Sequence, residues 1–178
     1  MSMAASRHRS DMASNIVIMG VAGCGKTTVG ERLSEVMGIP FRDGDTLHPQ
    51  ANIKKMASGV PLSDNDRRPW LQAIGQAFAS SGTPLIIGCS ALRRAYRDVI
   101  REMARGGVTF IHLTGSRDII AERMAKRRRH FMPLTLLDSQ FATLEPPGID
   151  EDPIVIDIDQ PPDAIVRIAA SQLGKTSE

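Results

Sequence analysis

A glycine-rich segment near the start of the chain limits what this protein can fold into. The segment follows a short apolar run, Ile16–Met19, and reads Gly-Val-Ala-Gly-Cys-Gly-Lys-Thr over residues 20–27. This is the G-x-x-x-x-G-K-T pattern, in which the N–H groups of a loop and of a helix N-terminus bind phosphate. The sequence therefore predicts a strand, a phosphate-binding loop and a helix in direct succession.

The residue types in this loop suit phosphate chemistry. Glycines let successive backbone N–H groups turn to one side, Lys26 supplies a cation for the β- and γ-phosphates, and the Thr27 hydroxyl can bind Mg²⁺. A tight strand-to-helix connection without a ligand is the alternative interpretation. We favour phosphate binding because the strand, the glycines, the Lys-Thr pair and the helix occur in the required order.

Chain length and charge narrow the classes of protein further. The chain has 178 residues, which suits one domain with a sizeable core. Lys and Arg total 22 against 20 Asp and Glu, and the net charge of +2 does not indicate a dedicated nucleic-acid binder. The two cysteines have no metal-site or disulfide spacing, which fits a reducing cytosol.

The ends of the chain and its hydropathy indicate a cytoplasmic protein with no membrane partner. No apolar run is long enough to span a bilayer, and the N-terminus lacks the apolar core of a secretory signal. Residues 1–14 mix polar and apolar types without periodicity, and we expect them to form a disordered tail. The folded domain is predicted over residues 15–175.

Strand and helix patterns alternate along the chain. Apolar, β-branched runs predict strands at 16–19, 39–42, 83–90, 108–113 and 154–159. Helical periodicity and capping residues predict helices at about 29–37, 48–59, 64–78, 92–103, 117–124, 134–144 and 162–173. This alternation predicts a single α/β domain with a parallel sheet of about five strands and helices on both faces.

Two carboxylates follow the second predicted strand. Asp43-Gly-Asp45 comes where that strand ends, and the carboxyl ends of parallel strands meet at the edge from which the phosphate-binding loop also emerges. We therefore expect Asp43 and Asp45 to lie near the bound phosphate. The alternative is an acidic turn without chemistry, because Asp-Gly is a common turn signal.

Cations also gather at the start of the helix predicted at 92–103. Arg93, Arg94 and Arg97 occupy its first turns, where the helix dipole favours acidic residues. This placement favours an anionic ligand nearby. The alternative is ordinary surface pairing with Asp98 and Glu102.

Beyond these motifs, the chain resembles the small P-loop gluconate kinases. The phosphate-binding loop alone would indicate only a nucleotide-binding superfamily, whereas the later strings separate this group from shikimate and adenylate kinases, which are similar in fold. The matching strings lie between Ile16 and Leu173 and read Met-Gly-Val-Ala-Gly-Cys-Gly-Lys-Thr, Asp-Gly-Asp-x-Leu-His-Pro, Asn-Ile-Lys-Lys-Met-Ala-Ser-Gly-x-Pro-Leu, Asp-Arg-Arg-Pro-Trp-Leu, Cys-Ser-Ala-Leu-Arg-Arg-x-Tyr-Arg-Asp, His-Phe-Met-Pro, Ser-Gln-Phe-x-Thr-Leu-Glu and Asp-Ile-Asp-Gln-Pro.

The resemblance implies an activity and its requirements. The expected reaction converts ATP and D-gluconate to ADP and 6-phospho-D-gluconate, with Mg²⁺ as cofactor. The expected architecture is a nucleoside-monophosphate-kinase-like domain with a mobile lid at about residues 123–133, and the expected assembly is a homodimer. Arg129 stands where some relatives have glycine, so the resemblance leaves the detailed conformation of the lid open.

The resemblance also assigns roles to individual residues. Lys26, Asp45 and Arg127 are the expected catalytic residues, with Asp45 beside the attacking hydroxyl. Thr27 and Asp43 are the expected Mg²⁺ residues. The expected nucleotide-binding residues are Gly20, Val21, Ala22, Gly23, Cys24, Gly25, Lys26, Thr27, Thr28, Arg123, Gln160 and Pro161. The expected substrate-binding residues are Asp45, His48, Lys54, Arg67, Arg93 and His130.

Two other functions compete with this interpretation. A kinase of another small metabolite, such as shikimate, would share the phosphate-binding loop. A nucleotide-dependent RNA-binding module could instead use the basic run Lys126–His130 with Phe131 beside it. We favour the small-molecule kinase because the basic run is short and the acidic turn at Asp43–Asp45 would repel a nucleic acid nearby.

Overall fold

The structure is a computed structural model that describes residues 14–127 and 133–176. Nearly all of the predicted tail, residues 1–13, lies outside the described residues, and so do residues 128–132 of the predicted lid. Where the chain is described, no helix is long and apolar enough to cross a membrane.

A sheet of five parallel strands lies at the centre of the molecule. Its order is β2-β3-β1-β4-β5, and all four neighbouring pairs are parallel. The strands are β1 Asn15–Met19, β2 Phe41–Asp43, β3 Ile86–Gly88, β4 Val108–Thr114 and β5 Ile154–Asp157. The predicted five-stranded parallel sheet is confirmed, with β3 shorter than the apolar run suggested.

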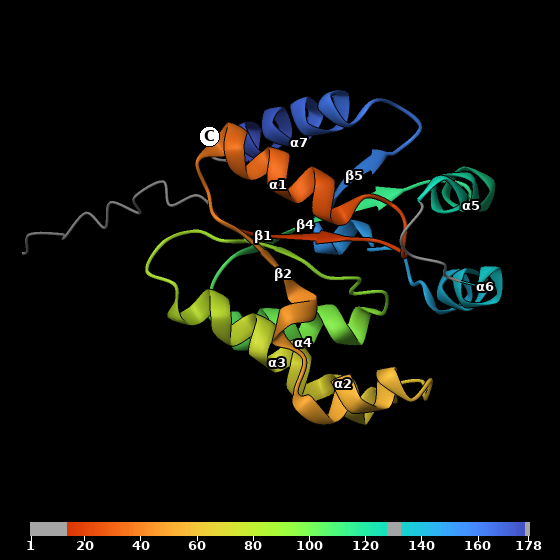
Figure 1. Cartoon of the computed structure of the whole chain (residues 1–178). Coiled ribbons are helices and arrows are strands. Elements are labelled where there is room, and N and C mark those ends of the chain that lie inside the picture. Colours follow the sequence, from red (N-terminus) through yellow and green to blue (C-terminus); the bar gives the residue numbers. More distant parts are fainter. Residues whose placement is uncertain (1–13, 128–132, 177–178) are drawn as a thin grey trace, which may run out of the picture.

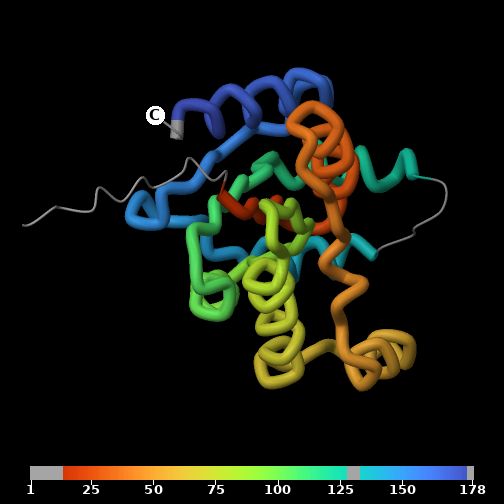
Figure 2. Tube along the Cα trace, turned by 90° about the vertical axis from the view of Figure 1, so that its left-hand side faces the viewer, coloured from red at the N-terminus to blue at the C-terminus, as the bar shows by residue number. Residues whose placement is uncertain are grey.

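Helices cover both faces of this sheet, as predicted. The helices are α1 Lys26–Met37, α2 Gln50–Ala57, α3 Asp64–Ser80, α4 Arg94–Ala104, α5 Arg117–Lys126, α6 Leu134–Thr143 and α7 Pro162–Thr176, with 3-10 turns η1 at Gly44–Leu47 and η2 at Ile149–Glu151. Helices α1 and α7 pack together on one face, and α3 and α4 pack together on the other (Figure 1). Both views place α2 at the end of the molecule opposite α7 (Figure 2).

The central strand β1 divides its side chains between two apolar cores. Ile16 and Ile18 are buried in the core that includes residues of α1 and α7. Val17 and Met19 are buried in the core that includes residues of α3 and α4. Successive side chains of a strand point to opposite faces, so a strand covered on both faces is apolar at every position.

Local signals set several helix ends. Ser63 accepts a hydrogen bond from the backbone N–H of Asp66, whose carboxylate accepts one from the N–H of Ser63, and this capping box begins α3. At the end of α1, Gly38 has φ 66° and its N–H donates to the carbonyl of Ser34. Both ends were predicted from the sequence.

The arginines at the start of α4 have carboxylate partners within the protein. Their ion pairs are Arg93 with Asp64 at 3.2 Å, Arg94 with Asp150 at 2.6 Å and Arg97 with Glu151 at 2.8 Å. Carboxylates from other segments of the chain therefore neutralise the cations at the start of this helix. The inference of an anionic ligand from these three residues was wrong for Arg94 and Arg97, because distant segments supply their counter-charges.

Candidate functional site

The glycine-rich loop leaves the C-terminal end of β1 and runs into the first turn of α1. Gly20 and Gly25 have φ values of 146° and 99°, a backbone conformation that side chains with a Cβ rarely adopt. A Cβ on Gly20 would also stand 2.7 Å from the carbonyl oxygen of Leu113 on β4. The loop sequence thus fits both the turn and its close contact with the sheet.

Lys26 lies at the first position of α1 and extends back along the loop. Its Nζ donates hydrogen bonds to the carbonyl oxygens of Gly20 and Val21, at 2.9 Å and 3.0 Å. Two backbone carbonyls of the loop therefore position the ammonium group.

Asp43 and Asp45 lie at the same edge of the sheet. Asp43 ends β2, and its Oδ1 accepts a hydrogen bond of 2.9 Å from the backbone N–H of Asp45. The intervening Gly44 is needed for space, because a Cβ there would collide with the carbonyl oxygen of Gly88 on β3. The predicted proximity of the carboxylates to the phosphate-binding loop agrees with this placement.

A cavity of about 660 Å³ opens over the loop, and we call it the phosphate cavity. Its lining residues are Ala22, Gly23, Gly25, Lys26, Thr27, Thr28, Asp43, Asp45, Met124 and Arg127. Oxygen ligands and bound phosphate are the partners that Mg²⁺ prefers in proteins. The Thr27 hydroxyl and the Asp43 carboxylate line the same cavity beside the loop, so this donor set fits Mg²⁺.

A second cavity of about 360 Å³ adjoins the first, and we call it the acceptor cavity. Five of its residues also line the phosphate cavity: Ala22, Lys26, Thr27, Asp43 and Asp45. The others are His48, Met56, Leu62, Arg67, Trp70, Gly88, Cys89, Ser90, Leu136 and Gln140. A small molecule in the acceptor cavity would therefore lie next to a phosphate held by the loop.

Burial changes the titration of three groups in the acceptor cavity. Desolvation raises the pKa of Asp45 above its ordinary value, and the neighbouring negative charge of Asp43 raises it further. Desolvation lowers the pKa of His48, against the smaller opposing effect of Asp45. Burial raises the pKa of the Cys89 thiol to about 12, which excludes a thiolate at neutral pH.

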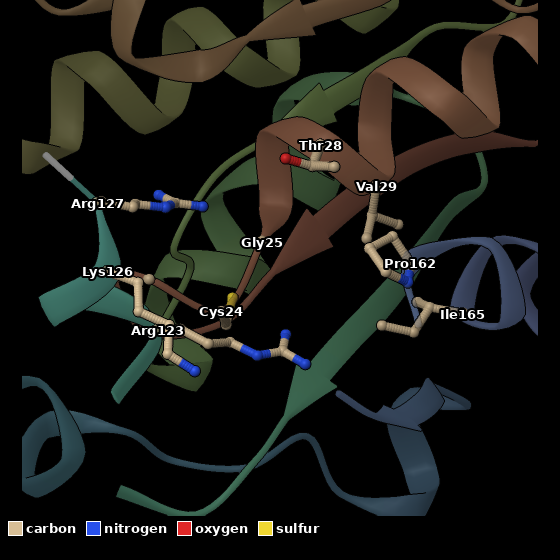
Figure 3. Close-up of a pocket in the computed structure, with 10 residues that line it drawn as sticks. Cys24, Gly25, Thr28, Val29, Arg123, Lys126, Arg127, Pro162 and Ile165 are labelled. Atoms are coloured by element: carbon tan, nitrogen blue, oxygen red, sulfur yellow. The ribbon is translucent and has the colours of Figure 1, made fainter. Parts of the chain in front are cut away.

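A third cavity, of about 280 Å³, adjoins the phosphate cavity and shares Gly23, Gly25, Thr28 and Arg127 with it (Figure 3). Arg123, Lys126 and Arg127 from the end of α5 form one side, and Thr28, Val29, Pro162 and Ile165 form the opposite side. The cavity thus lies between the cationic end of α5 and the first turn of α1. We call it the outer cavity.

Gln160 and Pro161, predicted near the adenine, lie in the connection from β5 to α7. The Gln160 Nε2 donates to the carbonyl of Asp157 at 2.6 Å, and the next residue after Pro161, Pro162, lines the outer cavity. Arg123 donates to the carbonyl of Ile158 in the same connection. The structure therefore brings the end of α5 and these two residues to one side of the loop.

Lys54 and Arg93, both predicted to bind substrate, are not among the residues that line the acceptor cavity. Lys54 is exposed on α2, and Arg93 pairs with Asp64 at 3.2 Å. Arg67 does line the cavity, and its Nη1 donates to the carbonyl of Leu62 at 2.7 Å. His130 lies outside the described residues.

Three lining or supporting residues were not assigned a role from the sequence. Gln140 on α6 accepts a hydrogen bond of 2.6 Å from the N–H of Ala22 in the loop. Trp70 on α3 stacks on His48 with ring centroids 4.1 Å apart. Asn52 contacts His48 from α2. The matching strings contain all three residues, but only the fold shows what each side chain contacts.

Comparisons with known proteins agree with this arrangement. The family model described as shikimate kinase matches residues 22–160. The thermoresistant gluconokinase of Escherichia coli strain K12 is 47% identical over 89% of this chain and 93% of its own length. A gluconokinase of Gluconobacter oxydans strain 621H is 43% identical over 85% of this chain and 86% of its own.

A solved structure of a gluconokinase is also similar to this chain. The crystal structure of a gluconokinase from Sinorhizobium meliloti 1021 is 48% identical, superposes with a TM-score of 0.86, and covers 93% of this chain and 94% of that one. The identity to these gluconokinases extends over nearly the whole chain. It therefore identifies the family more specifically than the shikimate kinase model does. The chain belongs to the gluconokinase family of P-loop kinases, whose fold is related to that of shikimate kinase.

Proposed function

We propose that this protein transfers the γ-phosphoryl group of ATP to D-gluconate and forms 6-phospho-D-gluconate. The observation that carries the assignment is the 47% identity, over 89% of the chain, to a protein named gluconokinase. The geometry supports it, because a cavity lined by charged side chains, among them Asp45 and Arg67, adjoins the phosphate-binding loop. The loop, Lys26 and Thr27 would bind the triphosphate.

Phosphoryl transfer depends mainly on positioning and charge stabilisation. In this proposal Lys26 contacts the transferring phosphoryl group, and Asp45 accepts a hydrogen bond from the attacking hydroxyl of the sugar acid. Arg67 supplies positive charge in the acceptor cavity. Gln160 and Pro161 would lie beside the adenine, close to the outer cavity.

Mg²⁺ belongs to the proposal as the partner of the ATP phosphates. Thr27 would bind it directly and Asp43 would hold it through water, and the ion would neutralise charge on the phosphates when bound. The family resemblance is also what supports a homodimer and a cytoplasmic location.

The test is ATP consumption by the purified protein with D-gluconate, with shikimate and with no acceptor. We expect rapid consumption with gluconate alone, and a product that carries phosphate on the terminal hydroxyl. The shikimate arm is included because the family model that matches residues 22–160 is described as shikimate kinase. Activity with shikimate and none with gluconate would overturn the assignment.

The two carboxylates should differ in the effect of their removal. Asp45→Asn should lower turnover by about 10²-fold, because the acceptor hydroxyl loses the group that orients it. Asp43→Asn should mainly raise the Mg²⁺ concentration needed for half-maximal rate. Initial rates over a Mg²⁺ titration would measure both effects.

Asp118→Asn is the matched control, because the Asp118 side chain is 97% exposed on α5. This substitution should change neither the turnover nor the Mg²⁺ concentration needed for half-maximal rate. The opposite result is a rescue of Asp45→Asn, but not of Asp43→Asn, by added Mg²⁺. That result would reverse the two roles.

We further propose that the end of α5 closes over the nucleotide as a lid. Arg127 is exposed and lines both the phosphate cavity and the outer cavity, so its guanidinium can reach bound phosphate. Arg127→Ala should lower turnover by about 10²-fold or more, because a charge-assisted contact to the phosphates is lost, while the free energy of unfolding changes little.

Hydrogen exchange and a control variant separate a lid from a static helix end. Amide exchange at residues 123–127 should slow when a non-hydrolysable ATP analogue and gluconate are added. Arg167→Ala, an exposed arginine on α7, should leave turnover unchanged. Exchange that is equally slow with and without ligands would exclude the lid.

A further inference from the structure

Asn52 is a buried polar side chain beside the acceptor cavity. It lies on α2, is 3% exposed, and contacts two groups through its amide nitrogen. Asn52 Nδ2 donates to the backbone carbonyl of Asp66 at 2.8 Å, and the same atom lies 3.3 Å from Nδ1 of His48. A side chain buried to this degree has few alternative orientations.

These contacts settle which amide atom of Asn52 faces His48. A backbone carbonyl can only accept a hydrogen bond, so the Asn52 atom 2.8 Å from the Asp66 carbonyl oxygen must be the nitrogen, which carries two protons. The second proton is available to His48 Nδ1. Because a donor faces it, Nδ1 must be the unprotonated nitrogen of the ring.

The ring of His48 is also fixed in its plane. It stacks on Trp70 with an interplanar angle of 15°, and the Trp70 Nε1 donates to the carbonyl of Gly44 at 2.8 Å. Gly44 lies between Asp43 and Asp45, so the stacked pair is tied to the turn that carries both carboxylates. With Nδ1 engaged by Asn52, Nε2 is the ring nitrogen that His48 can offer to a molecule in the acceptor cavity.

We propose that Asn52 holds His48 as the neutral Nε2–H tautomer, so that His48 donates one hydrogen bond to an oxygen of the bound acceptor. Asn52 is then a positioning residue that acts through His48. This inference rests on the proposed function for the identity of the acceptor, a polyhydroxy acid.

Charged groups from four parts of the fold surround His48. Asp45 of η1 favours the protonated ring, whereas Arg67 of α3 and desolvation oppose it, and the net result is a lowered pKa. Asp43 and Lys26 line the same cavity from β2 and the loop. The Asn52 amide adds to this balance, since protonating Nδ1 would bring an N–H donor against another donor.

Ring nitrogen NMR of the protein without substrate tests the tautomer directly. In a sample labelled at the four histidines, His48 should show a protonated Nε2 and an unprotonated Nδ1 at neutral pH. His48→Gln identifies the resonances. A proton on Nδ1, or titration of His48 at or above the ordinary pKa of about 6.5, would overturn the proposal.

Asn52→Asp provides the matched perturbation. Its carboxylate would accept a hydrogen bond from Nδ1–H, so the pKa of His48 should rise, and the KM for gluconate should become pH-dependent between about pH 6 and 8. In the wild-type protein the KM should be flat over this range. Asn65→Asp, which adds the same charge at an exposed position of α3, should leave both readouts unchanged.

Removing the donor itself should show its contribution. His48→Ala should raise the KM for gluconate by about two- to tenfold, the loss expected for one hydrogen bond.

Adding gluconate to the labelled protein should shift the Nε2 resonance and leave Nδ1 unprotonated. If the tautomer is as proposed but gluconate is not phosphorylated, the proposed function fails and the inference about Asn52 and His48 stands. An Nε2 resonance that does not respond to an acceptor that is phosphorylated would refute the donor role.

Discussion

Replacing Lys26 with alanine should reduce turnover by about 10²- to 10³-fold. Loss of one preorganised donor to a transition state costs on the order of 3–4 kcal/mol, and Lys26 is positioned for such a contact by the carbonyls of Gly20 and Val21. Stability should change little, because the variant loses only these two partly exposed hydrogen bonds and a long contact of 3.9 Å to Cys24 Sγ. Initial rates with saturating ATP and gluconate, and thermal unfolding of the same sample, give both quantities.

Lys175→Ala is the control, because Lys175 is exposed in the last turn of α7. It lies at the opposite end of that helix from Pro162, which lines the outer cavity. Its turnover should match that of the wild-type protein. A folded Lys26→Ala variant that retains near-normal turnover would refute the role of this loop in phosphoryl transfer.

Replacing Arg97 with methionine should lower the free energy of unfolding by about 3–5 kcal/mol. The Arg97 and Glu151 side chains are each 1% exposed, and the guanidinium contacts both carboxylate oxygens at 2.8 Å. The methionine variant would leave Glu151 buried with Arg101 as its remaining cationic partner, at 2.7 Å. It would also free the carbonyl of Ala91, which now accepts from Arg97 at 3.0 Å.

Arg94→Met is the matched control on the same turn of α4. Arg94 pairs with Asp150 at 2.6 Å, but both side chains are about half exposed, and such a pair contributes little to stability. Denaturant unfolding at neutral pH measures both variants. If Arg97→Met is no more destabilising than Arg94→Met, the buried pair does not hold α4 to η2.

The buried Arg97–Glu151 pair also predicts that stability depends on pH. Hydrogen bonds from Arg97, opposed by burial and aided by Arg101, lower the pKa of Glu151 from 4.5 to about 2. Because the folded-state pKa is depressed, the stabilisation is fully present above pH 4.5 and is lost as the pH falls towards about 2. Acid unfolding of Arg97→Met should show a weaker dependence in this window.

The sequence alone predicted the elements that depend on near neighbours along the chain. The strand, loop and helix around Gly20–Thr27, the start of α3 at Ser63 or Asp64 and the end of α1 at Gly38 are encoded within a few residues each. The parallel sheet followed from the alternation of strands and helices. The family resemblance then added His48 and Arg67 and gave Asp45 its role, and all three residues line the acceptor cavity.

Only the tertiary structure decided which polar groups meet. Gln140 reaches Ala22 across 118 positions of sequence, and Arg97 reaches Glu151 across 54. Lys54 was expected in the acceptor cavity, but it lies exposed on α2, whose buried residue is Asn52. Hydrophobic periodicity indicates which face of an element is buried, and it carries no information on which distant side chain that face will meet.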